Sequence, residues 1–156
     1  MAVPSQYLAI LNQMQTDIVA LGLTFSATLV PVRIVKIAQW LKGVSQPVLP
    51  IILICREDKP YAVTPWTTEN EVLAKYNAAV IAIAAGNRDN TANMDVWFQW
   101  DEQIRRLFQW GLQPAIQSCF FGEVIVDPPV LRDAALKNYD VAGMGLKLWN
   151  VEQRTN

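Results

Sequence analysis

The segment CFFGEVIVDPPVLRDAALKNYDVAGMGLKLWNVEQR, residues 119–154, decides the fold because two apolar extended stretches flank a short helical one. The first stretch ends at Pro128 and Pro129, which cannot donate hydrogen bonds to a sheet. Residues 130–138 suit about two turns of helix, and residues 139–152 are extended again. We therefore predict two strands that form the floor of a core on which the rest of the chain packs.

Alternation along the first stretch predicts which side chains share a face of that strand. Phe120, Gly122 and Val124 would point to one side, and Phe121 and Glu123 to the other. Glu123 then lies among apolar neighbours. We expect it to pair with a basic strand residue or with a group across a subunit boundary.

Two long amphipathic helices are predicted from the spacing of apolar residues. The first covers residues 5–21 and ends at Gly22, which suits a left-handed C-terminal cap. The second lies between Asn93, a capping residue, and Gly111. Their core-facing stripes are Tyr7, Leu11, Met14, Ile18 and Leu21 in the first helix, and Trp97, Trp100, Ile104, Leu107 and Phe108 in the second.

Three strands are predicted between these helices, over residues 30–38, 48–55 and 72–85. The second is apolar on both faces, so we expect it to be covered on both sides or to lie in an interface. Residues 56–71 are predicted to form a long loop because they hold two prolines among polar residues. The order α-β-β-β-α-β-(short α)-β predicts an α+β fold, a mainly antiparallel sheet with two long helices on one face.

The composition fits a single domain over residues 1–156 that contacts another chain. Hydrophobic residues make up 52% of the chain, and six tryptophans are too large an aromatic load to be wholly internal. In the first helix, Leu8, Ile10 and Val19 widen the apolar arc and leave room for a subunit contact.

Charge and cysteine content argue against several classes of protein. The net charge is −1 with no basic cluster, so tight nucleic-acid binding is not expected. Cys55 and Cys119 lack metal-binding or redox spacing and fit apolar strands in a reducing compartment. The sequence has neither a signal-peptide pattern nor an apolar run of membrane-spanning length. These features predict a soluble intracellular protein with no membrane contact.

The residues that usually carry enzyme chemistry are missing. The chain contains no histidine, which removes the commonest general base and most transition-metal sites. Gly143-Met144-Gly145 is no nucleotide-binding loop, because it lies inside a strand, where it predicts a bulge or a close helix contact. Asp133 and Asp140 flank the short helix and are expected to be surface or capping groups. We therefore expect no enzyme activity and no catalytic, cofactor-binding or metal-binding residue.

The C-terminal part of the chain carries a resemblance to a known family. It rests on FGEVIVDPPVLRDAALKNYDVAGMGLKLWNVEQR (residues 121–154), the helix DEQIRRLF (residues 101–108) and the strand LPIILI (residues 49–54). The shared features are a strand, a proline break with a short helix, and Asn-Tyr-Asp-Val leading into a glycine-containing strand that ends Glu-x-Arg. This pattern resembles the tail terminator proteins of long-tailed bacteriophages, also called tail completion or neck proteins.

The resemblance implies a subunit of a homo-oligomeric ring, usually a hexamer. Such a ring caps the tail tube, stops its polymerisation and joins it to the head-side connector or stopper protein. DNA passes through its lumen without specific binding, and the ring assembles in the host cytoplasm and remains in the tail or neck of the virion. The tryptophan content departs from the family pattern and leaves the partner open.

Two other functions fit the residues. The chain is alternatively a stand-alone α+β domain, an enzyme or a small-molecule binder, with tryptophans around its pocket. It is otherwise another ring component of the neck, such as a head-closure or tube-like protein. A terminator forms closed rings and a tube protein forms long tubes, whereas a ligand-binding domain can remain monomeric.

The predicted loop over residues 56–71 is a candidate docking arm. Tyr61 and Trp66 are rigid amphipathic side chains of the kind that anchor protein interfaces. Prolines in the same stretch lower the entropy lost when a partner orders it. The alternative is that this segment folds back on the edge of its own sheet.

Other interface candidates lie in the second helix and in the C-terminal motif. Arg105 and Arg106 follow Asp101 and Glu102 by four residues, but exposed pairs of this kind contribute only about 0.3–0.5 kcal/mol each. We therefore expect both arginines to contact a neighbouring subunit as well. The remaining candidates, from the C-terminal motif, are Tyr139, Asp140 and Arg154.

Overall fold

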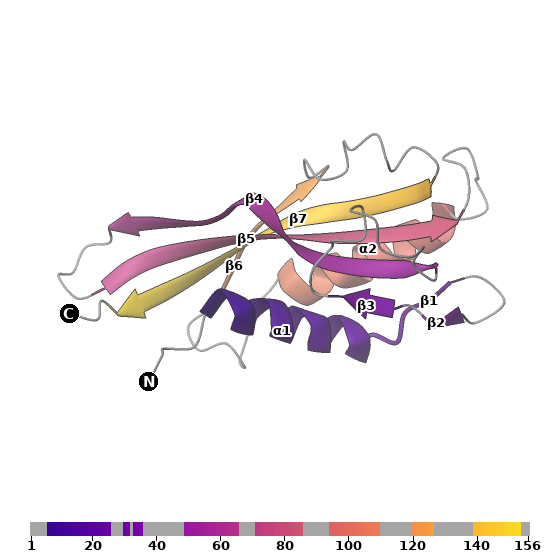
Figure 1. Ribbon diagram of the computed structural model, residues 1–156, viewed down its shortest axis with the longest axis horizontal. Coiled ribbons are helices and arrows are strands. Elements are labelled where there is room, and N and C mark those ends of the chain that lie inside the picture. The colour runs from indigo at the N-terminus through magenta and orange to yellow at the C-terminus, as the bar shows by residue number, and fades with distance from the viewer. Residues whose placement is uncertain are drawn as a thin grey trace, which may run out of the picture.

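The computed structural model describes residues 6–25, 30–31, 33–35, 49–65, 71–85, 94–109, 120–126 and 139–153. In chain order its elements are α1 (Gln6–Ala20), β1 (Thr24–Phe25), β2 (Val30–Pro31), β3 (Arg33–Val35), β4 (Ile51–Pro65), β5 (Glu71–Ala85), α2 (Met94–Gln109), β6 (Phe120–Val126) and β7 (Tyr139–Gln153). Figure 1 shows the long strands β4, β5 and β7 crossing the molecule, with α1 running beneath them.

The main sheet is mostly antiparallel, with the strand order β3-β4-β5-β7-β6. Only the short β3 pairs in parallel, with β4, and the other three pairings are antiparallel. The predicted α+β class is therefore confirmed. The single strand predicted over residues 30–38 is wrong, because β2 pairs with β1 in a separate sheet and only β3 joins the main one. The predicted short helix over residues 130–138 lies outside the described residues.

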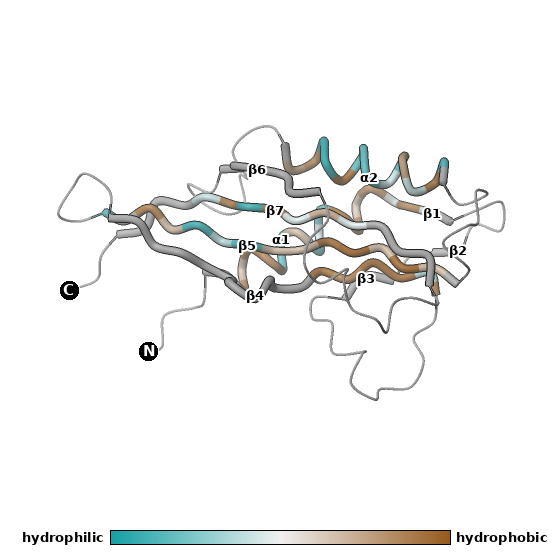
Figure 2. Tube along the Cα trace, turned by 90° about the horizontal axis from the view of Figure 1, so that it is seen from above, coloured by the Kyte–Doolittle hydropathy of each residue, from teal (hydrophilic) through white to brown (hydrophobic). Residues whose placement is uncertain are grey.

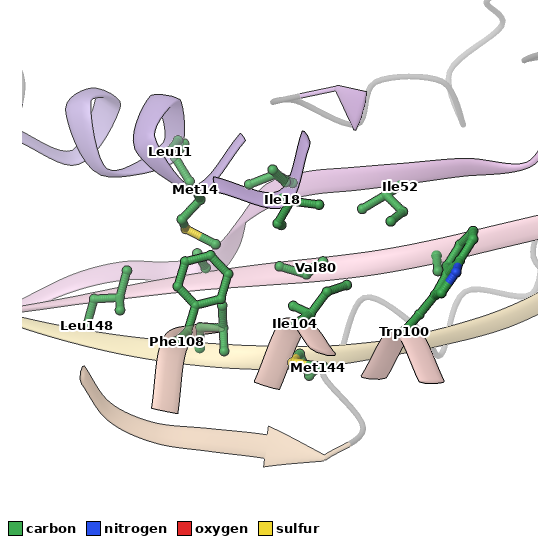
Figure 3. Close-up of a cluster of buried hydrophobic side chains, with 14 of the residues drawn as sticks. Leu11, Met14, Ile18, Ile52, Val80, Trp100, Ile104, Phe108, Met144 and Leu148 are labelled. Carbon is green, nitrogen blue, oxygen red and sulfur yellow. The ribbon is translucent and has the colours of Figure 1, made fainter. Parts of the chain in front are cut away.

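Both helices pack on the same face of the sheet. The core includes Met14 and Ile18 from α1 and Ile104 and Phe108 from α2, each at most 2% exposed. They meet even-numbered residues of β5 and β7, as Figure 3 shows for Val80, Met144 and Leu148. Each fully buried side chain of this size stabilises the fold by about 1.5–3 kcal/mol. Both predicted core-facing stripes are confirmed, with Tyr7, Leu21 and Leu107 only partly buried at their margins.

Polar contacts fix the position of α1 and of the chain that follows it. Gly22 has φ of 60°, and its N–H donates to the Val19 carbonyl at 3.1 Å, which confirms the predicted left-handed cap. The Tyr7 ring stacks on Tyr76 with centroids 5.5 Å apart, while its hydroxyl donates to the Asn77 carbonyl at 2.5 Å. These contacts hold the N-terminal end of α1 against β5.

The opposite face of the sheet is also buried over one half of its length. Ile51 and Leu53 on β4 and Ile81 and Ile83 on β5 are at most 6% exposed, although no described helix lies on that face. This confirms the prediction that β4 is covered on both sides there. Figure 2 shows hydrophobic residues concentrated where β5 runs beside β3, and hydrophilic ones in the other half of β5 and β7.

Strand β4 continues through the predicted loop. Tyr61 to Pro65 pair with Tyr76 to Val72 of β5, so the loop prediction is wrong for residues 56–65. The polar residues and Pro60 that suggested a loop lie at an irregularity between Arg56 and Tyr61, where the register shifts. Beyond Leu53, β4 has no second partner among the described strands, and prolines are tolerated on such an edge.

The strand registers also correct the predictions made around two glycines, Gly122 and Gly143. The β6–β7 register shifts between Phe121 and Glu123, which makes Gly122 an extra residue in β6. Phe121 is then in register with Leu148, on the face that includes Val124, so the predicted sharing of faces is wrong for Phe120 and Phe121.

Gly143 lies in an unbroken ladder opposite Ile81, so the bulge predicted around it is wrong. The close approach at this glycine comes from the β5 backbone rather than from a helix. A Cβ at residue 143 would lie 2.7 Å from the Val80 carbonyl oxygen and 3.3 Å from the Ile81 Cα. The position is restricted to glycine by the neighbouring strand.

We expect Gly143→Ala to lower the free energy of unfolding by about 1–3 kcal/mol, because the clashing atoms belong to a strand that cannot move without loss of pairing. Urea denaturation measures this change. Gly22→Asn is the control, because a Cβ there meets nothing within 4 Å and asparagine tolerates the left-handed conformation. Equal loss in the two variants would contradict the close packing of β7 on β5.

Candidate subunit interface

The outward face of α2 combines charge with one large exposed aromatic side chain. Asp95 lies in the first turn and Arg106 in the last, an arrangement that complements the helix dipole. Phe98 is 66% exposed, although Trp97 beside it is buried. An exposed phenylalanine among charged side chains is typical of a surface that another protein covers.

The two predicted charge pairs on α2 differ in the kind of interaction that they make. Arg106 Nη2 lies 2.5 Å from Glu102 Oε1, with both side chains at least half exposed, so this pair is confirmed. Arg105 acts on Asp101 electrostatically and favours its charged form. Neither interaction needs a neighbouring subunit, and an exposed pair of this kind stabilises the helix by only about 0.3–0.5 kcal/mol.

A shallow apolar crevice lies where α2 meets the sheet. Its volume is about 250 Å³, counting the open space at its mouth. Trp97 and Trp100 form part of its wall and meet edge to face, with ring centroids 5.2 Å apart. The Trp100 Nε1–H donates to the Thr24 carbonyl at 3.0 Å, which fixes the orientation of that ring. The other lining residues are Val80, Ala82, Asp101, Ile104, Gly143 and Met144.

Asp101 is the charged member of this crevice. Burial raises the pKa of its carboxyl above the ordinary value of 3.8, and the positive charge of Arg105 opposes that rise. Among the described residues, no group of three or more His, Cys, Asp and Glu is placed to hold a metal ion. A single carboxylate beside two tryptophans suits contact with a cationic or polar group rather than metal binding.

The sheet face opposite the helices becomes polar in the half of β5 and β7 that lies away from β3. Lys75 Nζ lies 5.1 Å from the centroid of the Trp149 ring, a cation–π contact across neighbouring strands. Lys147 is directly opposite Glu123 in the β6–β7 register. The β6–β7 register therefore places a basic strand residue opposite Glu123, as predicted. Both lysines are half-buried.

The sequence-predicted interface residues do not form one cluster. Tyr61 is opposite Tyr76 on β5, whereas Tyr139 is opposite Ala85 and Asp140 is one residue away. Tyr76 and Ala85 are nine residues apart along β5, which at strand geometry is about 30 Å. Arg105 and Arg106 lie on α2. Trp66 and Arg154 fall outside the described residues.

Sequence reasoning missed Phe98 and the partial desolvation of Asp101, whose side chain is exposed but also lines the crevice. On a helical wheel Phe98 lies 100° from Trp97, among the charged residues, so its exposure was available from the helix period alone. The partial desolvation of Asp101 was not available, because it depends on how closely α2 approaches β5 and β7.

Among the described residues, no helix is both long and apolar enough to cross a bilayer.

The raised pKa of Asp101 predicts a pH-dependent stability difference. Above pH 3.8 the folded chain retains this proton more strongly than the unfolded chain, so the free energy of unfolding falls as pH rises through the raised pKa. Asp101→Asn removes this loss. We expect the variant to be more stable than the parent above that range, by less than about 1 kcal/mol because the group is partly exposed.

Urea denaturation from pH 3 to pH 7 measures this difference, which should disappear towards pH 3. Gln103→Asn, on an exposed position of the same helix, changes no titrating group and should show a constant difference. A constant difference for Asp101→Asn as well would contradict the assigned role of burial.

Comparison with known proteins adds no relative. No family model matches the chain, and no curated protein matches its sequence. The likeness to tail terminators is therefore a resemblance of motif and element order, which supports a proposal about function rather than membership of the family.

Proposed function

We propose that this chain is a structural subunit of a homo-oligomeric ring of the tail-terminator type. The ring, a hexamer in the family it resembles, would cap a phage tail tube, end its polymerisation and join the tail to the head-side connector. DNA would pass through the lumen without specific binding. The subunit would have no catalytic role, and would remain in the virion after assembly in the host cytoplasm.

The observation that carries this proposal is the outward face of α2. This helix includes residues 101–108, part of the segment on which the resemblance rests, and it exposes Phe98 beside Glu102 and Arg106. An aromatic anchor with a charged rim is the composition of a protein interface. The one-sided α+β architecture, with its outward helix surface, supports the same conclusion.

The crevice beside α2 supports a ligand-binding function less well. Most of its 250 Å³ is open space at the mouth, and the room inside it for water-sized groups is only about 10 Å³, far below the roughly 300–1,000 Å³ of typical small-molecule sites. Among the residues that the structure describes, Asp101 is the only charged one that lines it. A small-molecule site needs several convergent polar groups, so the crevice fits a side chain of a protein partner better than a free ligand.

We propose a docking role for one end of the sheet, where residues of the predicted loop are paired with β5. There β4 from Tyr61 to Pro65 pairs with β5, which pairs in turn with the end of β7. Pro65 removes one donor from the strand edge and disfavours non-specific strand addition. The projecting end is a rigid surface for the next ring or for the tail tube.

Electron microscopy of negatively stained purified protein tests the proposal. We expect closed rings of uniform size, with native mass spectrometry giving one subunit number. Long tubes without added partner would favour a tube protein. A monomer at every concentration, both alone and with a phage tail tube protein, would overturn the ring.

The arginines of α2 allow a sharper test. Arg105→Glu together with Arg106→Glu should weaken the oligomer at least tenfold, while the melting temperature falls by only a few degrees, because the intrahelical pairs contribute so little. Sedimentation velocity measures assembly and circular dichroism measures melting. Parallel loss of both would mean that the arginines act only within their own helix.

A swapped pair, Glu102→Arg with Arg106→Glu, is the matched control. It retains the intrahelical ion pair and the net charge but reverses the pattern that a neighbour meets. Recovery of assembly in the swapped variant would show that the pair, and not the contact with a neighbour, is what assembly requires.

A further inference from the structure

We draw no further inference here: the strongest candidate, the shallow crevice between α2 and the sheet in which Asp101 lies beside Trp97 and Trp100, belongs to the interface already described, and nothing in the structure shows which group of a partner occupies it.

Discussion

Strand β5 is the element on which the rest of the structure depends. It pairs with β7 along its whole length and with β4 along most of it, so its backbone groups are bonded on both sides. Residues 78–84 are all buried, on both faces of the sheet. Three of its four helix-facing residues are alanines, Ala78, Ala82 and Ala84, which lets α1 and α2 approach that face while the other is also covered. A helix placed on a strand with larger side chains would lie further out, and the α2 crevice would widen.

Much of this architecture could be predicted from local patterns. The two helix stripes follow from a period of 3.6 residues, and Gly22 follows from the need for positive φ at the end of α1. Both are properties of a few adjacent residues. The length of β4 could not be predicted in this way, because Pro60 and the charged residues around it favour a turn locally. Pairing with β5 outweighs that preference and places the irregular residues at a shift in register.

The same distinction between local and tertiary signals decides which features of the candidate interface could be predicted from the sequence. The Glu102–Arg106 pair is a matter of helix spacing and was predicted correctly. The partial desolvation of Asp101 and the restriction on Gly143 depend on how closely β7, β5 and α2 approach one another, which no local pattern encodes. Gly122 is a further case, since one extra residue in β6 reverses the faces of the residues before it. Such positions need the register of a partner strand.

The two helices cover the same sheet face and yet expose opposite chemistry. The exposed positions of α2 include Asp95, Glu102 and Arg106, whereas the exposed positions described for α1 carry no charge. The proposed contact through α2 would therefore be screened over a Debye length of about 8 Å at physiological salt. Ionic strength would change that contact without changing the fold, because the core beneath both helices is one apolar cluster.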